Sequence, residues 1–235
     1  MNKYEILTND SIIYNDKTLY RIRLLKDIGN GDTFKVGEIG GYIENEFNLS
    51  QDGDCWVDKN SKVIGNVKIY DNALINNSTV TNIDNEESKI HGESIIVNAT
   101  VNISGCDIYD NAKIIDINWL SNSKVYGDAC LLGTCLLLDD SEIKDVSLFD
   151  VSLASSARIS KPNHYGKIDG FGLERQIEFY KNKNNGVNVV VDGHIELVCD
   201  IHKFKEQFES GELELGISKD NFSILMHYIE KSILE

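Results

Sequence analysis

Aliphatic residues recur at every sixth position through the middle of the chain, from Val57 to Ile159. Two copies of the unit are nearly identical, Ile69-Tyr-Asp-Asn-Ala73 and Ile108-Tyr-Asp-Asn-Ala112. The first positions of the units are Val57, Val63, Ile69, Ile75, Ile90, Ile96, Ile108, Ile114, Val125, Leu131, Leu137, Ile143, Phe149, Leu153 and Ile159. An amphipathic helix would show three-four spacing and a half-buried strand would alternate at every second position, so neither template fits.

The other positions of the unit explain this period. Position five is small or β-branched, as at Ala73 and Cys106, and positions three and four are turn formers, as at Gly65-Asn66 and Asp71-Asn72. Gly, Asn and Asp tolerate left-handed backbone angles, so we expect the chain to bend once per unit. Three short strands per turn form a triangular coil of about eighteen residues, stacked at the ~4.8 Å spacing of a β-ladder. The pattern predicts a mainly β protein built on a parallel β-helix of roughly six coils.

The register of the repeats slips in places. Three extra residues lie within residues 81–89, and the unit after Phe149 is two residues short. We expect such irregularities at corners, where extra residues bulge outward without disturbing the ladder. Asn102 stands at a first position, so either its amide points inward or the register shifts and Val101 or Ile103 takes the inward place.

Residues 1–54 precede the repeats and are predicted to form a hairpin and cap. Strand-like alternation runs through residues 3–26, interrupted by the turn sequence Asn15-Asp16-Lys17. Gly40 and Gly41 are expected to let the backbone approach the first coil closely, and Trp56 is expected to cover the open end of the helix. Repeat proteins need such caps because their end coils otherwise expose open ladder edges.

The hexad period ends at Pro162, so the chain divides into residues 1–54, a β-helix over 55–162 and a C-terminal domain over 163–235. In the last part, alternation over residues 175–181 and 187–199 predicts a small antiparallel meander, with a turn at Asp192-Gly193. Asp200 is expected to cap a helix that ends at Gly211. A second helix is expected to begin at Ser218, and both helices to pack on the meander.

The repeats and the segment before them resemble known hexapeptide-repeat proteins. The repeats resemble the hexapeptide repeats of the left-handed parallel β-helix. The stretch before them, with Gly40-Gly-Tyr-Ile-Glu44, Asn48-Leu-Ser-Gln51 and Cys55-Trp-Val57, resembles the opening of the YdcK-like hexapeptide proteins common in phages and prophages, and Gly170-Phe-Gly172 is similar to their terminal domain. The resemblance implies a left-handed β-helix that associates as a homo-oligomer, a trimer or dimer. Because only some hexapeptide proteins are acyltransferases, the resemblance implies the fold more strongly than an activity.

Composition narrows the class of protein. The formal net charge of the 235 residues is −15, with acidic residues in all three segments, and such a surface repels nucleic acid and anionic membranes. Five cysteines show no pairing pattern, and no apolar run reaches the length of a membrane span or of a signal peptide core. We therefore expect a soluble cytoplasmic protein with buried thiols and neither direct nucleic acid binding nor membrane binding.

Candidate catalytic chemistry is sparse. Hexapeptide acyltransferases typically use one histidine as general base, and among the five histidines only His91 lies on the repeats, where Glu93 could orient it. No His or Cys pair has metal-ligand spacing. The sequence predicts no cofactor, with acetyl-CoA required only if the protein is an acyltransferase.

Corner acids suggest another kind of function. Equivalent positions recur in register in a β-helix, so Asp110, Asp128 and Asp139 are predicted to contribute to a rigid negative ladder that binds a partner. The leading hypothesis is a non-enzymatic phage-type interaction protein, such as an anti-CRISPR or other counter-defence inhibitor, which binds a host protein or protein–nucleic acid complex. The alternatives are an acyl-CoA-dependent acyltransferase with His91 as its base, and a trap for a nucleotide signal in grooves between subunits.

Overall fold

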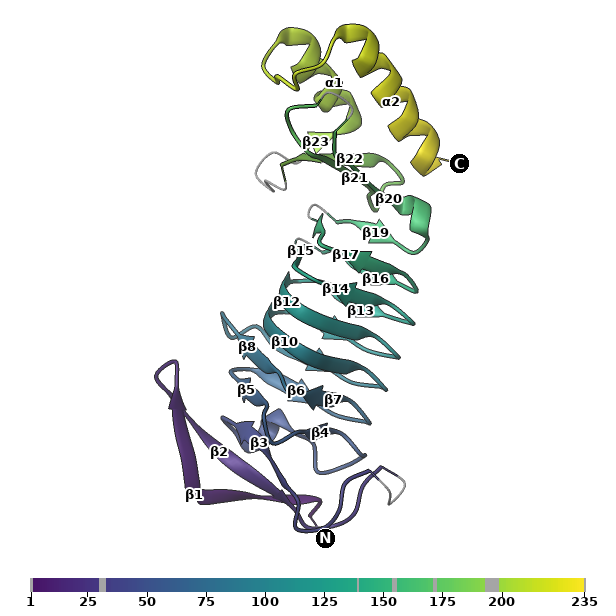
Figure 1. Cartoon of the computed structure of the whole chain (residues 1–235). Helices are drawn as coiled ribbons and strands as arrows, with labels where there is room; N and C mark the ends of the chain where they lie inside the picture. The colour runs from purple at the N-terminus through teal and green to yellow at the C-terminus, as the bar shows by residue number, and fades with distance from the viewer. Residues whose placement is uncertain are drawn as a thin grey trace.

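The computed structural model describes residues 2–29, 33–138, 140–153, 156–170, 173–192 and 199–234, apart from the side chains of Ile117 and Leu234. Short parallel strands form a β-solenoid of about seven turns, with an N-terminal hairpin at one end and a small domain with two helices at the other (Figure 1). The predicted mainly β fold, a β-helix with a small C-terminal domain, is confirmed.

Each turn places strands on three faces. Face 1 consists of β4 (Trp56–Val57), β7 (Leu74–Asn76), the first parts of β10 (Ile95–Ser104) and β12 (Lys113–Ser121), β14 (Cys130–Leu132) and β17 (Ser147–Phe149). Face 2 consists of β3 (Ile39–Ile43), β5 (Lys62–Ile64), β8 (Thr79–Asn82), the second parts of β10 and β12, β15 (Cys135–Leu137) and β18 (Ser152–Leu153). Face 3 consists of β6 (Val67–Ile69), β9 (Ser88–Ile90), β11 (Asp107–Ile108), β13 (Lys124–Tyr126), β16 (Glu142–Lys144) and β19 (Arg158–Ile159).

The first positions of the repeats form one continuous core. Side chains predicted to point inward are at most 1% exposed at Val63, Ile69, Ile75, Ile108, Leu131 and Ile143. Corner residues with positive φ, such as Asp71 (57°) and Gly65 (80°), let the backbone turn between faces. The period of six therefore arises from alternating short strands and left-handed corners.

Two details differ from the hexad count. Phe149 is 65% exposed, whereas Leu148 is 6% exposed and takes the inward place. The cause is a shorter turn, because Leu148 pairs with Leu131 only seventeen residues earlier. At the other irregular site the register shift is confirmed, since Val101 and Ile103 are fully buried on either side of Asn102.

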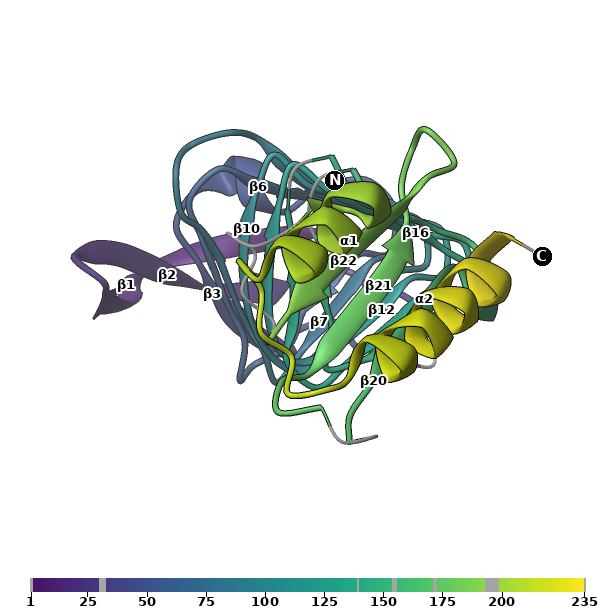
Figure 2. The ribbon, with the colours of Figure 1, turned by 90° about the horizontal axis from the view of Figure 1, so that it is seen from above.

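The N-terminal hairpin consists of β1 (Tyr4–Tyr14) and β2 (Lys17–Leu24), whose turn residues Asn15 and Asp16 have positive φ. Strand β2 pairs antiparallel with β3, which pairs parallel with β5, so the first turn begins within the segment that the sequence assigns to the cap. A short 3-10 helix, η1 (Glu46–Asn48), follows β3. Seen along the axis, the hairpin projects to one side of the coils (Figure 2).

The predicted close approach before the first coil is confirmed. A Cβ atom on Gly41 would lie 2.5 Å from the carbonyl oxygens of Asp58 and Ser61. A Cβ atom on Gly40 would lie 2.5 Å from the ring of Trp56, which is fully buried. These glycines let β3 lie directly over the first coil, with the indole packed beneath it.

The C-terminal domain follows η2 (Pro162–His164) and covers the last coil (Figure 2). Its antiparallel sheet consists of β20 (Tyr165–Ile168), β21 (Ile177–Lys181), β22 (Val187–Val191) and β23 (Cys199–Asp200), on which α1 (Ile201–Ser210) and α2 (Lys219–Leu234) pack around a separate core. Asp200 accepts hydrogen bonds from the backbone of His202 and Lys203, and Gly211 ends α1 with φ of 82°, as predicted. Gly193, of the predicted turn, and Gly172 lie outside the described residues.

Candidate functional site

His91 lies directly after β9, on the outer edge of face 3, and its side chain is 22% exposed. Its Nε2 atom is 2.9 Å from Asp107 Oδ1, and its Nδ1 atom is 3.6 Å from Asp71 Oδ2. Glu93, the residue predicted to orient it, instead accepts a hydrogen bond of 2.6 Å from Asn72. The carboxylates that hold His91 come from neighbouring coils because strands in adjacent turns place their outward side chains next to one another.

His91 also belongs to a column of four rings, Tyr70, His91, Tyr109 and Tyr126, which we call the ring stack. The ring centroids are 4.5, 5.3 and 4.9 Å apart, and adjacent planes are inclined by 9 to 11°. Each ring occupies the same position of its repeat, so the spacing follows the distance between coils. Burial, reinforced by the nearby Asp107 carboxylate, raises the pKa of Tyr70, and burial likewise raises that of Tyr109. Both phenols therefore keep their protons at neutral pH.

The outward side chains in the central row of face 3 are charged, and they form ion pairs with one another or with adjacent side chains. Its members are Lys68, Lys89, Asp107, Lys124, Glu142 and Arg158. Glu142 lies 3.5 Å from Lys124 and 3.7 Å from Arg158, while Glu87 pairs with both Lys68 and Lys89. From Lys89 to Arg158 the charges alternate in sign along this row, and Glu87 offsets the adjacent Lys68 and Lys89.

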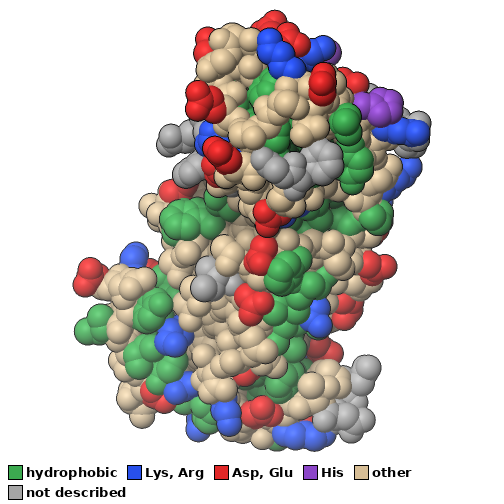
Figure 3. Space-filling model, turned by 45° about the horizontal axis from the view of Figure 1, so that its top comes forward, with side chains coloured by type: hydrophobic (Ala, Val, Ile, Leu, Met, Phe, Trp, Pro, Cys, Tyr) green, Lys and Arg blue, Asp and Glu red, His purple; other side chains and the backbone are tan. Residues whose placement is uncertain are grey.

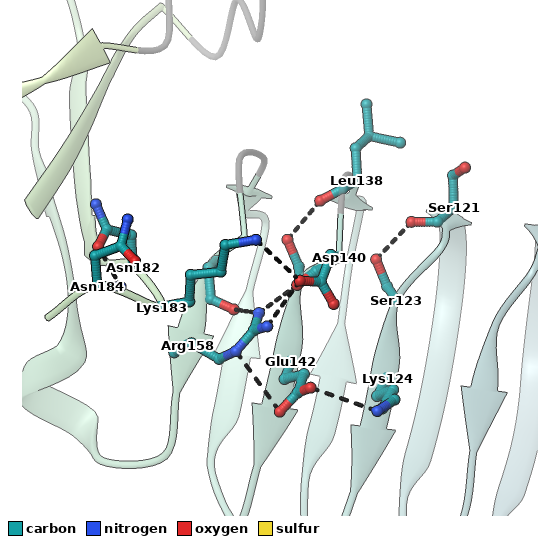
Figure 4. Close-up of polar contacts among 12 residues, drawn as sticks. Ser121, Ser123, Lys124, Leu138, Asp140, Glu142, Arg158, Asn182, Lys183 and Asn184 are labelled. Atoms are coloured by element: carbon teal, nitrogen blue, oxygen red, sulfur yellow. Dashed lines mark hydrogen bonds and ion pairs between the residues drawn. The ribbon is translucent and has the colours of Figure 1, made fainter. Parts of the chain in front are cut away.

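The central row of face 3 ends at the C-terminal domain in a cluster of ion pairs (Figure 4). Arg158 Nη2 donates to Asp140 Oδ2 over 2.9 Å, and Lys183, from the turn between β21 and β22, lies 3.5 Å from the same oxygen. The hydrogen bond from Arg158 lowers the pKa of Asp140 below its ordinary value. Asp140 therefore links the last coils to the C-terminal domain.

A different arrangement occurs at the corner between face 3 and face 1. Exposed acids follow one another there from coil to coil, and we call them the corner row: Asp71, Glu93, Asp110, Asp128 and Asp145. Neighbouring coils hold two of these carboxylates, since Asp110 accepts from the amide of Gly127 in the next coil (3.2 Å) and Asp145 from that of Asp128 in the preceding coil (2.9 Å). Among the described residues, one Lys or Arg forms an ion pair with an acid of this row: Lys144 lies 3.7 Å from Asp145.

Two of the three predicted binding residues are thus neighbours. Asn111 Nδ2 bridges the coils by donating to Asp128 Oδ1 over 2.8 Å, next to Asp110. Asp139 lies outside the described residues. The prediction that Asp139 belongs to the same ladder therefore stays a prediction.

The outward side of face 1 is mostly apolar between β7 and β17, with Asn76, Lys113 and Ser147 as its polar side chains. Its row of half-buried and exposed side chains consists of Leu74, Ile95, Val97, Ile115, Cys130, Leu132 and Phe149, which we call the apolar row. Lys113 is the charged residue of these strands that faces outward. In the view of Figure 3, hydrophobic side chains run along the shaft and acidic ones are scattered beside them.

The remaining candidates do not form a site with His91. His164 is buried and accepts a hydrogen bond from the amide of Ser160, His202 and His227 lie on the helices of the C-terminal domain, and His194 falls outside the described residues. A groove of about 440 Å³ lies between β20 and α2, lined by Ile168, Ile224 and Tyr228 among others, and His91 does not line it. Within the described part of the chain, no group of three potential metal ligands is present.

The fold and these surfaces define a β-solenoid that carries the corner row and the apolar row on different sides. Comparison of the chain with protein-family models and with curated proteins finds no match. The resemblance to YdcK-like hexapeptide proteins therefore stays a prediction. In the part of the chain that the structure describes, no helix has the length and apolar character needed to cross a bilayer.

Proposed function

We propose that this protein is a non-enzymatic interaction protein that binds a basic macromolecule through the corner row. The observation that supports this most directly is the row itself, in which acids of successive coils project from one edge. Hydrogen bonds from backbone amides of neighbouring coils fix Asp110 and Asp145 in place. A rigid row of carboxylates loses little conformational freedom on binding, so more of the interaction energy contributes to affinity.

The partner is a basic surface of a protein or of a protein–nucleic acid complex, because the net charge of −15 repels free nucleic acid. The ring stack beside the row supports the same proposal, since tyrosine is enriched in protein interfaces. A counter-defence role, such as an anti-CRISPR inhibitor acting in the host cytoplasm, follows if the resemblance to phage proteins holds. No cofactor enters this function.

The test compares two matched pairs of corner acids. Asp110→Asn with Asp145→Asn neutralises the corner row, while Asp116→Asn with Asp150→Asn neutralises the corner between faces 1 and 2. All four residues have positive φ, which Asn tolerates, and all accept from a backbone amide of the neighbouring coil.

The wild type and both double variants are immobilised, and proteins of a host lysate are captured and eluted with increasing salt. We expect the first pair to lose the captured partner at lower salt and to associate more slowly, because charge complementarity mainly raises association rates. The second pair should behave as the wild type. Equal losses in both variants, or in neither, would contradict a site at the corner row.

The hydrogen bond between His91 and Asp107 supports a second candidate, an acyl-CoA-dependent acyltransferase. A carboxylate that orients an imidazole is the usual arrangement for a general base. Turnover of acetyl-CoA that disappears in His91→Gln, with an unchanged melting temperature, would favour this candidate. Under the interaction proposal, the same variant keeps partner binding.

A further inference from the structure

The N-terminus contains a buried amine beside a buried thiol. Lys3 precedes β1 and is fully buried, as is Cys55 in the first coil. Lys3 Nζ lies 2.8 Å from the carbonyl oxygen of Cys55, 3.4 Å from that of Asp52 and 3.0 Å from Cys55 Sγ. The backbone of Lys3 is held as well, because its amide donates to Gln51 Oε1 over 2.8 Å. The nitrogen and sulfur atoms are thus fixed at the separation of a reactive contact.

The site also favours the reactive protonation state of the amine. Burial lowers the pKa of Lys3, although Cys55 opposes this shift, so a neutral amine forms more readily than on the surface. Burial raises the pKa of Cys55, and Lys3 opposes that rise. Cys106 and Cys135 are equally buried, but their sulfur atoms contact the carbonyl oxygens of Ser104 and Leu132.

We propose that Lys3 and Cys55 form a covalent sulfenamide cross-link when the protein meets a peroxide. Hydrogen peroxide first oxidises the Cys55 thiol to a sulfenic acid: an S–O bond forms, the O–O bond breaks and one water leaves. The lone pair of Lys3 Nζ then attacks the sulfur, an N–S bond forms, the S–O bond breaks and a second water leaves. Altogether one thiol, one amine and one peroxide give one sulfenamide and two waters, with two electrons passing from sulfur to peroxide.

The cross-link would fasten the N-terminal strand to the first coil. It closes a loop between residues 52 positions apart, which restricts the unfolded chain. Peroxide reaches the buried pair during local opening of the N-terminal segment. We therefore expect a slow modification that raises the melting temperature and is reversed by thiol reductants.

The test treats the purified full-length protein with hydrogen peroxide, blocks free thiols and maps the peptides by mass spectrometry. We expect a peptide joining Lys3 to Cys55, lighter than the two reduced peptides by two hydrogen atoms and released by dithiothreitol. Lys3→Arg keeps hydrogen-bond donors at this position but removes the nucleophilic amine, so it should give Cys55 sulfinic acid in place of the cross-link. Cys106 serves as the internal control, because its sulfur atom contacts the carbonyl oxygen of Ser104 and, among the described residues, no amine forms a hydrogen bond with it.

Three results would overturn the proposal. The first is unmodified Cys55 in the wild type under conditions that oxidise Cys106. The second is oxygenated Cys55 with no joined peptide. The third is a joined peptide that retains an oxygen atom, which would replace the sulfenamide with an N–O–S bridge. None of these results depends on a variant that fails to fold.

Discussion

Face 1 and face 3 of the solenoid share one core and one kind of backbone ladder, yet they present different chemistry to solvent. The outward side of face 1 carries the apolar row, with Lys113 beside it, whereas face 3 presents paired charges and the ring stack. The backbone cannot explain this difference, because both faces are built from short parallel strands in register. The inward positions therefore specify the fold, and the outward positions specify what each face can bind.

The contrast assigns different roles to the two faces. The charges of face 3 are largely paired with one another, so the adjacent corner row, where the Lys partner of the described residues is Lys144 beside Asp145, is the part suited to a basic partner. A flat row of aliphatic side chains gains free energy when another surface covers it. We therefore propose that face 1 mediates the predicted homo-oligomer, which leaves the corner row accessible.

The largest effect is expected from a change in the shared core, because unfolding the solenoid disrupts both faces. Ile108→Asp places a carboxylate in the continuous core, where Ile108 is fully buried. Burying an unpaired charge costs several kcal/mol or forces the group to take up a proton, so the variant should be unfolded or aggregated at neutral pH. Circular dichroism and thermal melting measure this. Thr100→Asp, at an exposed position, is the control and should melt near the wild type.

A smaller effect, confined to face 1, is expected from Ile115→Lys combined with Phe149→Lys. Both side chains belong to the apolar row, so the two charges should prevent its burial and shift the protein toward monomer without unfolding it. Light scattering after size exclusion at micromolar concentration measures the mass. Lys89→Ser with Lys124→Ser makes two changes on face 3 and should leave the mass unchanged. A wild type that is monomeric under the same conditions would remove the proposed oligomer altogether.

On face 3, Tyr109→Ala should lower stability by about 1–3 kcal/mol, because each of its two stacked ring pairs contributes roughly 0.5–1.5 kcal/mol beyond its buried area. Tyr109 stacks on both His91 and Tyr126, so its loss interrupts the ring stack in the middle. Urea unfolding measures the change. Tyr109→Phe keeps the ring and should be close to neutral; if it destabilises the protein as much as Tyr109→Ala, the hydroxyl and not the stack is responsible.

The inward positions could be predicted from the sequence because each must be apolar, and the hexad period follows from that requirement. The period fails where a turn loses or gains residues, which is why the hexad count points to Phe149 although Leu148 occupies the inward place. The outward site was harder to predict. His91 was found as a lone histidine on the repeats, but its partners Asp71 and Asp107 lie on neighbouring coils, and finding them requires the length of each turn.

The ring stack did leave a signal in the sequence. Tyr70 and Tyr109 occupy position two of two nearly identical units, and His91 and Tyr126 stand at the same position of others. Aligning the units by their aliphatic residue would have placed these rings in one column. The corner row needed one further fact, namely which of the three corners each turn sequence occupies, and the repeated unit does not carry it.

The smallest effect is expected at the ion-pair cluster where face 3 meets the C-terminal domain. The hydrogen bond from Arg158 lowers the pKa of Asp140 in the folded protein, whereas the unfolded chain has an ordinary aspartate pKa of about 3.9. The unfolded state therefore binds the proton at higher pH than the folded state. The stabilisation is present above the ordinary pKa and is lost as the pH falls through the folded pKa.

Urea unfolding between pH 7 and pH 3 should show a steeper loss of stability in the wild type than in Asp140→Asn, which has no group to titrate at position 140. Asp140 is largely exposed and screened by solvent, so the difference is expected to be small and to shrink further in high salt. Parallel curves for the two proteins would mean that Lys183 and Arg158 join the C-terminal domain to the solenoid without help from this carboxylate.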